Sequence, residues 1–296
     1  IAMMRLDKMH MKPFRLSWKK QIRYNINRIN DRQTKYNRRL YMDLGHKGKT
    51  VIISGGSKGI GAGISEVFAQ EGANLVINYH RNKESCLEFA CYLSERYGIR
   101  TATVQGDVGK EEDVAAIFDC ATQNFGRIDI LVNNAGNHCK KYIWEMSVEE
   151  YVNVLNVHLV GAFALTKAFV PHMKENRRGR IIFQASMTSY IGQPQVAGYS
   201  TAKAGYLGLI HTLTAELAEY GITVNAIAPG WIDTPMFHKA TDNDAPRLAK
   251  IIGRIPAKEV GDPMDVGMCA AFLCSEAARY ISGTCIPVDG GALIGF

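Results

Sequence analysis

From Lys49 onward, the sequence alternates short runs of β-branched residues with longer amphipathic runs. Residues 50–54 form an apolar run, as expected of a strand that is covered on both faces. Residues 59–70 follow with apolar side chains at helical spacing. Strand–helix alternation of this kind predicts an α/β fold with a doubly wound parallel sheet and helices on both faces.

The same alternation continues to the C-terminus. We expect further strands at residues 74–79, 100–105, 128–132, 180–185, 223–228 and 284–288, and helices at residues 83–96, 111–125, 148–173, 197–220 and 264–274. No internal repeat or low-complexity linker follows residue 45, so we expect a single domain at residues 46–296. Ligands of such sheets bind outside the carboxyl ends of the strands, at the topological switch point.

The positive charge of the chain is concentrated at its N-terminus. The whole chain carries a formal net charge of +7, whereas residues 1–41 alone hold 12 Lys and Arg against 2 Asp. We expect residues 1–45 to be a basic extension that is disordered or weakly helical. A nucleic-acid-binding or membrane-binding tail, an organelle transit peptide and a misassigned start before Met42 are the alternatives.

Composition excludes several other classes of protein. No run of 18 or more apolar residues occurs, so we expect no membrane span. The 7 cysteines are scattered and form no CxxC pair, which predicts reduced thiols in a cytoplasmic protein. No cluster of His, Cys and carboxylates has ligand spacing, so we expect no metal site.

A glycine-rich turn follows the first predicted strand. Gly55, Gly59 and Gly61 lie between this strand and the next helix in a GxxxGxG pattern. Without Cβ atoms, the turn can be tight and a pyrophosphate can approach the backbone. The amino end of the helix offers free N–H groups and a positive dipole to phosphates. The pattern therefore predicts a dinucleotide site, although a glycine-rich turn without a ligand also fits it.

Three residues near the start of the helix predicted at 197–220 suggest proton transfer. Tyr199 and Lys203 are four residues apart, so they lie on one face of the helix, and Ser186 follows the preceding strand. A nearby ammonium group stabilises a phenolate and lowers the pKa of the tyrosine. The serine hydroxyl can hold the substrate oxygen. Together these groups can move a proton between an alcohol and a carbonyl while a hydride moves at carbon.

The chain from about Gly48 to Phe296 resembles the short-chain dehydrogenase/reductase family in its single-domain form. The motifs that carry the resemblance are the glycine turn, Asn133-Asn134-Ala135-Gly136, Ser186 placed 13 residues before Tyr199, Pro229-Gly230 with Thr234, and Val288-Asp289-Gly290-Gly291. The resemblance implies a Rossmann fold and an NAD(P)-dependent oxidoreductase that acts on CH–OH groups.

The resemblance also implies roles for individual residues. Tyr199 would be the acid/base, Lys203 would lower its pKa and bind the nicotinamide ribose, and Ser186 would hold the substrate oxygen. The expected cofactor contacts are Gly55, Ser57, Lys58, Gly59, Ile60, Gly61, His80, Arg81, Asp107, Val108, Asn134, Ala135, Gly136, Tyr199, Lys203, Pro229, Gly230, Ile232 and Thr234. Two of them, Lys58 and Arg81, are included for their positive charge, which is discussed below.

Two positions depart from the family pattern. Ser54 stands where Thr is usual and keeps the hydroxyl. The fourth catalytic position of the family is an Asn within the long helix, and His158 occupies it here. A neutral imidazole can both accept and donate a hydrogen bond. We therefore expect His158 either to keep a proton relay with altered pH dependence or to be a buried histidine bonded to a backbone carbonyl.

The segment after the second predicted strand bears on the choice of cofactor. NAD selectivity usually requires an acidic residue there, and residues 78–82 (NYHRN) contain none. Lys58 and Arg81 could reach a 2′-phosphate. We therefore expect NADP, with NAD possible.

The sequence does not specify a substrate beyond a small carbonyl or alcohol compound. Residues 231–255 are expected to form the substrate lid, and His138, Met187 and Ile191 are further pocket candidates. Residues 137–142 lack the Thr-Arg-Asp run of 3-oxoacyl-carrier-protein reductases and look closer to polyol and sugar-acid dehydrogenases. The family resemblance implies a homotetramer that packs through the helices at 148–173 and 197–220.

Other classes of function remain as alternatives. They are a cofactor-binding regulator whose catalysis has lapsed, which only His158 favours, a 3-oxoacyl-carrier-protein-type reductase, a nucleic-acid-binding protein acting through its tail, and a longer sugar-nucleotide epimerase or dehydratase. We expect no specific nucleic-acid partner and no membrane partner.

Overall fold

A computed structural model describes residues 43–295 of the chain, and the expected basic extension therefore lies almost wholly outside the described residues. Seven strands form one parallel sheet in the order β3-β2-β1-β4-β5-β6-β7. Their bounds are β1 (Thr50–Ile53), β2 (Asn74–Tyr79), β3 (Thr101–Gln105), β4 (Ile130–Asn133), β5 (Gly179–Gln184), β6 (Ile222–Pro229) and β7 (Cys285–Val288). The predicted doubly wound sheet is confirmed, and its switch point lies between β1 and β4.

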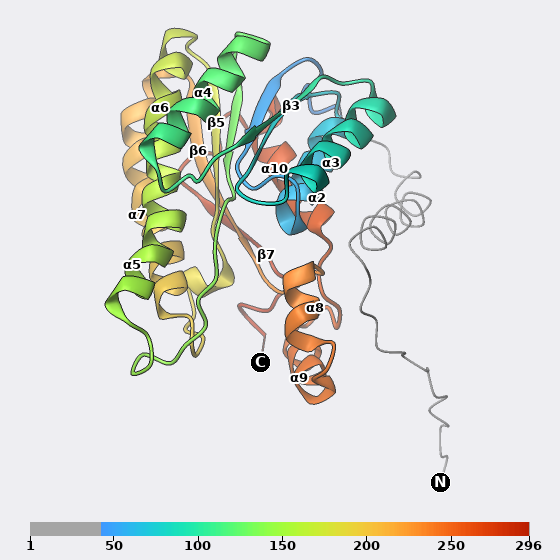
Figure 1. Ribbon diagram of the computed structural model, residues 1–296, viewed down its shortest axis with the longest axis vertical. Helices are drawn as coiled ribbons and strands as arrows, with labels where there is room; N and C mark the ends of the chain where they lie inside the picture. Colours follow the sequence, from blue (N-terminus) through green and yellow to red (C-terminus); the bar gives the residue numbers. More distant parts are fainter. Residues whose placement is uncertain (1–42, 296) are drawn as a thin grey trace. The chain divides into compact units, whose positions relative to one another are not determined.

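Helices cover both faces of the sheet (Figure 1). One layer consists of α2 (Gly59–Gln70), α3 (Lys83–Tyr97) and α10 (Pro263–Leu273). The other consists of α4 (Glu111–Phe125), α5 (Val148–Leu155), α6 (Gly161–Glu175) and α7 (Ala197–Leu217). Two short helices, α8 (Pro235–Thr241) and α9 (Ala245–Arg254), lie apart from both layers.

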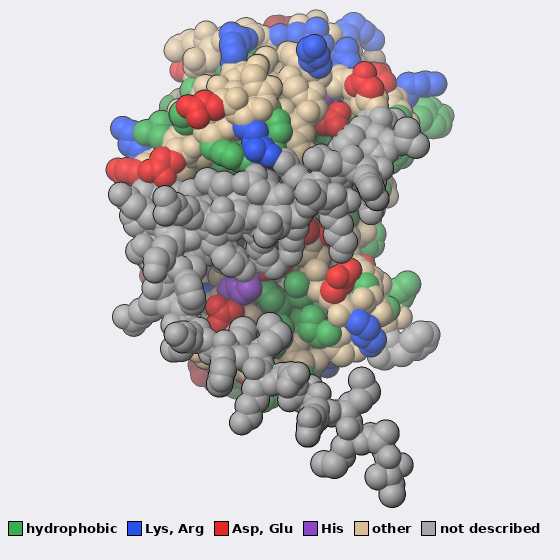
Figure 2. Space-filling model, turned by 90° about the vertical axis from the view of Figure 1, so that its right-hand side faces the viewer, with side chains coloured by type: hydrophobic (Ala, Val, Ile, Leu, Met, Phe, Trp, Pro, Cys, Tyr) green, Lys and Arg blue, Asp and Glu red, His purple; other side chains and the backbone are tan. Residues whose placement is uncertain are grey.

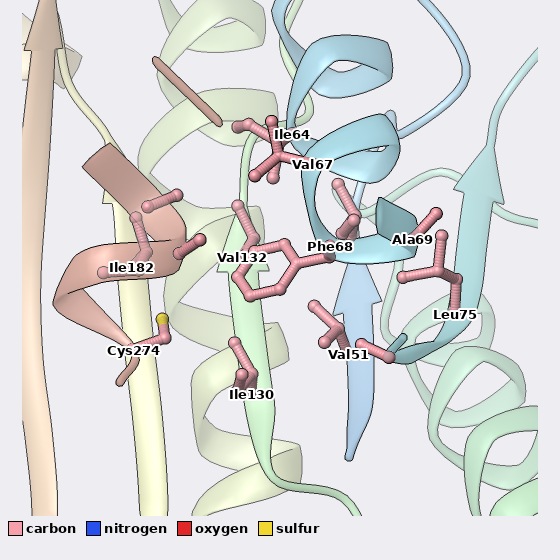
Figure 3. Packing of buried hydrophobic residues seen from close by; sticks show 14 of the residues in the cluster. Val51, Ile64, Val67, Phe68, Ala69, Leu75, Ile130, Val132, Ile182 and Cys274 are labelled. Atoms are coloured by element: carbon pink, nitrogen blue, oxygen red, sulfur yellow. The ribbon is translucent and has the colours of Figure 1, made fainter. Parts of the chain in front are cut away.

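Successive side chains along the central strands point to opposite faces of the sheet, so each strand contributes to the hydrophobic core on both faces. Val51 and Ile53 of β1 pack on the α2 side, whereas Ile52 packs on the α7 side, and all three are fully buried. Figure 3 shows Val51 and Val132 against Phe68 of α2. Because both faces are covered, the strand is apolar at every position.

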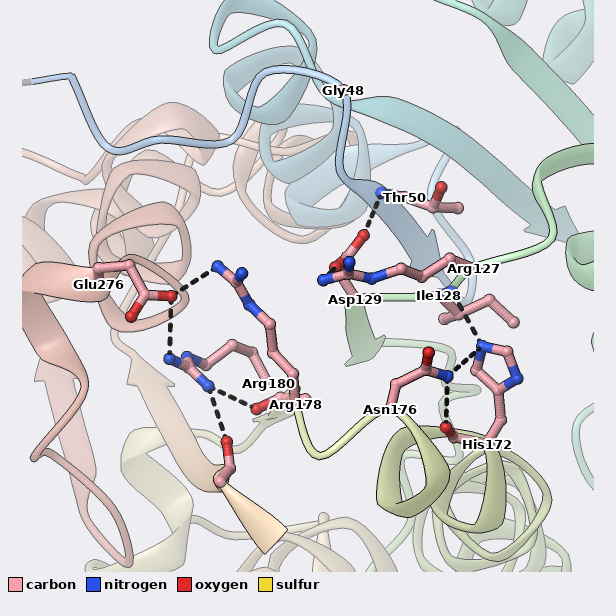
Figure 4. A network of polar contacts seen from close by, with 12 residues as sticks. Gly48, Thr50, Arg127, Ile128, Asp129, His172, Asn176, Arg178, Arg180 and Glu276 are labelled. Atoms are coloured by element: carbon pink, nitrogen blue, oxygen red, sulfur yellow. Dashed lines mark hydrogen bonds and ion pairs between the residues drawn. The ribbon is translucent and has the colours of Figure 1, made fainter.

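Polar contacts close the sheet at the amino ends of the strands (Figure 4). The Asp129 carboxylate accepts a hydrogen bond from the Thr50 backbone N–H at 3.0 Å and pairs with Arg127 at 2.7 Å. Arg178 and Arg180 converge on Glu276 at 2.6 and 3.4 Å. These contacts lie at the edge of the sheet opposite to the glycine turn.

The helix predicted at residues 148–173 is not continuous. A π-helical turn, η1 (Asn156–Val160), separates α5 from α6 and contains His158. Sequence periodicity does not reveal this turn; in the structure the Tyr206 hydroxyl of α7 donates to the His158 carbonyl oxygen within it. Among the described residues, the span Val148–Glu175 is long and apolar enough to cross a membrane, a test that core helices of soluble proteins also pass.

Candidate active site

The glycine turn brings the backbone of β1 against that of β4. Gly55 has a φ of +64°, and a Cβ there would lie 3.2 Å from the Ala135 Cα. A Cβ at Gly61 would lie 2.3 Å from the Gly55 carbonyl oxygen. Side chains are therefore excluded at Gly55 and Gly61 because the turn packs closely on itself and on residues 134–135.

Ser54 and Asn134 tie the two strands at the switch point. The Ser54 hydroxyl accepts hydrogen bonds from the N–H groups of Asn134 and Ala135 at 2.9 and 3.0 Å. The Asn134 amide nitrogen donates to the carbonyl oxygens of Ser54 and Gly55 at 3.0 and 3.2 Å. The hydroxyl of Ser54 thus holds together the turns that follow β1 and β4.

The amino end of α2 is suited to a phosphate group. Its first turn holds no acidic side chain, and Lys58 precedes it without a side-chain cap. The buried amide of Asn78, at the end of β2, accepts from the Gly55 N–H at 3.3 Å and donates to the Gly106 carbonyl at 3.0 Å. Asn78 was not identified from the sequence as a functional residue. A polar residue in the apolar run of β2 was the available signal.

The expected adenosine contacts lie at the ends of β2 and β3. His80 and Arg81 are exposed, and the His80 Nε2 lies 3.9 Å from an Asp107 carboxylate oxygen. Val108 is buried. The structure therefore brings His80 and Asp107 together at this edge and leaves the guanidinium of Arg81 open to solvent.

The motif residues that follow β6 reach the same edge of the sheet. Pro229 ends β6, and a Cβ at Gly230 would lie 2.8 Å from the Asp289 Cβ. Thr234 caps α8 by accepting from the Phe237 N–H at 3.2 Å. A Cβ at Gly59 would lie 3.5 Å from the Thr234 Cγ2, so Thr234 lies against the glycine turn.

The segment expected to form the substrate lid begins and ends at residues that are hydrogen-bonded to each other. Ile232 is buried and forms a bridge with Gly261. The Asp233 N–H donates to the Gly261 carbonyl at 2.8 Å, and the Gly261 N–H donates to the Trp231 carbonyl at 2.9 Å. The two ends of residues 233–260 are thereby held together. Two helices, α8 and α9, lie inside the segment for which the sequence predicted only a lid.

Ser186, Tyr199 and Lys203 meet where β5 ends and α7 begins. Burial raises the pKa of the Tyr199 hydroxyl, and its interaction with the Ser186 side chain lowers it. The Lys203 ammonium is buried, lies 5.5 Å from the centroid of the Tyr199 ring and donates to the Gln184 carbonyl oxygen. Burial lowers the pKa of Lys203 to about 7.

His158 is buried beside this group. Its ring lies edge-on to Tyr199, with centroids 5.2 Å apart, and its Nε2 lies 2.8 Å from the Asn137 carbonyl oxygen. The tautomer protonated at Nε2 fits this contact. Burial and, secondarily, the charge of Lys203 lower the pKa of His158 to about 3, so the imidazole is neutral. Its Nδ1 is buried and has no partner among the described residues.

Gly136 makes room for the imidazole. A Cβ at this position would lie 2.2 Å from the His158 Cε1. The ring of His138 lies on the other side, 6.3 Å from that of Tyr199. The rings of two histidines, His158 and His138, thus lie beside the Tyr199 ring.

Comparison with known proteins identifies the family. A family profile described as enoyl-(acyl carrier protein) reductase matches residues 55–292. The chain is 41% identical over 254 residues to 3beta-hydroxysteroid dehydrogenase 1 of Eggerthella lenta, covering 85% of this chain and 95% of that protein. It belongs to the short-chain dehydrogenase/reductase family.

Other members of the short-chain dehydrogenase/reductase family are nearly as similar. Glucose 1-dehydrogenase 2 of Bacillus subtilis is 39% identical over 254 residues, with 85% of this chain and 96% of that protein covered. The crystal structure of L-sorbose reductase from Gluconobacter frateurii, complexed with NADPH and L-sorbose, superposes with a TM-score of 0.82 at 34% identity, covering 86% of this chain and all of that one.

Membership settles the class of reaction. This short-chain dehydrogenase/reductase is an oxidoreductase that interconverts an alcohol and a carbonyl with NAD(P). The predicted family, Rossmann fold and action on CH–OH groups are confirmed. Among the described residues, no group of three or more His, Cys, Asp and Glu could hold a metal ion.

Proposed function

We propose that Tyr199 is the acid/base of the reaction, with Ser186 holding the substrate oxygen and Lys203 favouring the phenolate. The convergence of Ser186 and the buried Lys203 ammonium on the Tyr199 side chain, at the carboxyl ends of the strands, carries the proposal. The nicotinamide accepts or supplies the hydride when it is bound. The Tyr199 hydroxyl gives its proton to the carbonyl oxygen during reduction, and the Tyr199 phenolate accepts the proton of the alcohol during oxidation.

The turns at the carboxyl ends of the strands are suited to binding the cofactor. Gly55 and Gly61 let the glycine turn pack tightly on itself and on the start of the segment after β4, and the amino end of α2 at this turn offers N–H groups to a phosphate. The other proposed contacts from the glycine turn, β3, β4 and the segment after β6 are Ser57, Lys58, Gly59, Ile60, Asp107, Val108, Asn134, Ala135, Gly136, Pro229, Gly230, Ile232 and Thr234. Lys203 would hold the ribose next to the nicotinamide.

NADP is the proposed cofactor, with NAD as the alternative. No acid follows β2, where a carboxylate would bind the adenosine ribose hydroxyls and repel a 2′-phosphate. Lys58 and Arg81 are both exposed there and carry positive charge. The similar L-sorbose reductase was crystallised with NADPH. A KM for NADH below that for NADPH would overturn the assignment.

We propose that His158 replaces the asparagine of the family without ionising. The unpartnered Nδ1 of a neutral imidazole can accept a hydrogen bond from a water molecule and so join a proton relay. A cofactor-binding regulator without catalysis is the alternative that this substitution leaves open.

The substrate is proposed to be a small carbonyl or alcohol compound of the polyol, sugar or hydroxysteroid class. The relatives named above act on such compounds, and a 3-oxoacyl-[acyl-carrier-protein] reductase of Staphylococcus epidermidis is 35% identical over 243 residues. A reductase of that last type is the second candidate. His138, beside Tyr199, is placed to contact a further polar group of the substrate.

We further propose a cytoplasmic homotetramer without a membrane or nucleic-acid partner. A groove of about 500 Å³ lies between α6 and α7 and is lined by apolar side chains, among them Phe163, Val170 and Leu213. Phe163 and Val160 are about half exposed along the same helical span. A second subunit would cover them. Sedimentation would test the tetramer, and a monomer would refute it.

The experiment that tests the proposal measures the absorbance of NADPH at 340 nm with L-sorbose, a 3-oxosteroid and acetoacetyl thioester, and NADP reduction with D-glucose. Tyr199→Phe is the matched variant, because it removes only the hydroxyl. Turnover by the wild type that is lost in Tyr199→Phe supports the assignment. Turnover retained in Tyr199→Phe refutes it, and NADPH binding without turnover of any of these substrates favours the regulator.

A further inference from the structure

Helix α7 carries a third side chain on the face that holds Tyr199 and Lys203. Tyr206 follows Lys203 by three residues, which places it on the same side of the helix. Its side chain is 1% exposed and packs against Phe183 of β5. No motif in the sequence identifies Tyr206, and the proposed reaction does not use it.

The ring of Tyr206 faces the Lys203 ammonium. The Lys203 Nζ lies 4.8 Å from the Tyr206 ring centroid and 5.5 Å from that of Tyr199. The other titratable groups around it are His158 of η1, whose imidazole is neutral, and His138 beyond it. Among the described residues, no carboxylate is paired with Lys203, so the two aromatic faces and the Gln184 carbonyl are the groups that favour its charged form against burial, which lowers its pKa to about 7.

The hydroxyl of Tyr206 binds the π-turn. It donates to the His158 carbonyl oxygen at 2.5 Å in a buried contact. A π-turn interrupts the regular pattern of helical hydrogen bonds, so its carbonyl groups need other partners. The Tyr206 hydroxyl satisfies this one and thereby connects α7 to the turn that carries the His158 imidazole.

We propose that Tyr206 is a positioning residue: its ring retains the charge on Lys203, and its hydroxyl holds the π-turn that orients His158. This inference rests on the proposed function for its catalytic meaning, because it assumes that Lys203 and His158 serve Tyr199. Its two physical parts are observable without substrate. The ring and the hydroxyl can be removed separately, since Tyr206→Phe keeps the ring and Tyr206→Leu removes both.

The first measurement follows the charge of Lys203. Protein with ¹³C at the lysine Cε is titrated by NMR, and the Lys203 signal is assigned by its loss in Lys203→Met. Removing the ring disfavours the ammonium, so the midpoint should fall by about 0.4 to 1.5 pH units in Tyr206→Leu and stay unchanged in Tyr206→Phe. Tyr220→Leu, which removes a ring 4.2 Å from the Lys174 ammonium, is the control and should leave the Lys203 midpoint unchanged.

The second measurement follows the π-turn. Amide hydrogen exchange of residues 156–160 should become about three- to tenfold faster in Tyr206→Phe, because one hydrogen bond is lost. An unchanged exchange rate in Tyr206→Phe, or an unchanged Lys203 midpoint in folded Tyr206→Leu, overturns the inference. If Tyr206→Leu does not fold, the rate of amide hydrogen exchange in Tyr206→Phe alone decides whether the inference stands.

Kinetics then separate this inference from the proposed function. With a substrate that the wild type reduces, the alkaline limb of kcat/KM should move to lower pH in Tyr206→Leu by the same amount as the Lys203 midpoint. A limb that stays in place while the midpoint moves would overturn the role in catalysis. Activity retained in Tyr199→Phe would refute the proposed function, and the two substrate-free measurements would still decide whether Tyr206 holds Lys203 and the π-turn.

Discussion

Replacing Gly136 by alanine tests the close packing around His158. The new Cβ would lie 2.2 Å from the His158 Cε1 and 2.8 Å from its Nδ1, whereas carbon atoms in contact are about 3.5–4.0 Å apart. The ring would have to move by more than about 1 Å. It is held on the other side by Tyr199 and by the bond to the Asn137 carbonyl, so it cannot move freely.

Overpacking of this kind costs about 1–3 kcal/mol, and for a domain of this size that lowers Tm by about 2–12 °C. Urea or thermal unfolding of Gly136→Ala measures the loss. In the His158→Ala background the clash disappears, so the same substitution should cost at least about 1 kcal/mol less. Gly208→Ala is the control, because a Cβ there meets nothing within 4 Å and should stabilise the helix by about 0.5–1 kcal/mol. Equal losses for Gly136→Ala in both backgrounds would refute the packing argument.

Three further predictions concern charge. Arg81→Ala should raise the KM for NADPH about tenfold and leave that for NADH unchanged, since one ion pair with the 2′-phosphate is lost; equal effects on both would contradict its role. Because the pKa of His158 is lowered to about 3, His158→Asn should move no limb of the kcat/KM profile between pH 5 and 9, and the disappearance of such a limb would show that the imidazole ionises. Burial lowers the pKa of His46 to about 4, so the stability that its neutral form gives is present above pH 6.5 and is lost as the pH falls toward 4. Between pH 7 and 5, the free energy of unfolding measured by urea denaturation should therefore fall by about 2 kcal/mol. The His46→Gln variant should not show this drop.

The elements that periodicity and glycine placement define were predictable from the sequence. The bounds of α2, β2 and α4 agree with the predicted ranges because each begins and ends at a change of apolar period. The glycine turn and the Tyr199–Lys203 pair were predictable as well, since chemistry requires those residue types at fixed spacing. The structure places them at one edge of the sheet.

Features that depend on contacts between distant residues were not predictable. The carbonyl oxygen of His158 in the π-turn accepts a hydrogen bond from Tyr206, 48 residues away, and no local pattern marks this contact. The backbone carbonyl oxygen of Gln184 accepts a hydrogen bond from Lys203, and the identity of the Gln184 side chain does not indicate this backbone contact. The helices α8 and α9 are short and both have proline in their first turn, so their apolar pattern is too brief to distinguish a helix from a loop.

The bridge between Ile232 and Gly261 has a practical consequence. It pins both ends of residues 233–260, and the strands and the glycine turn are complete without them. A segment anchored in this way can be exchanged for one of different length or composition at a small cost in loop entropy. Libraries that vary residues 235–260 and keep both anchors and Thr234 would therefore retarget substrate selectivity while leaving the affinity for the nucleotide intact.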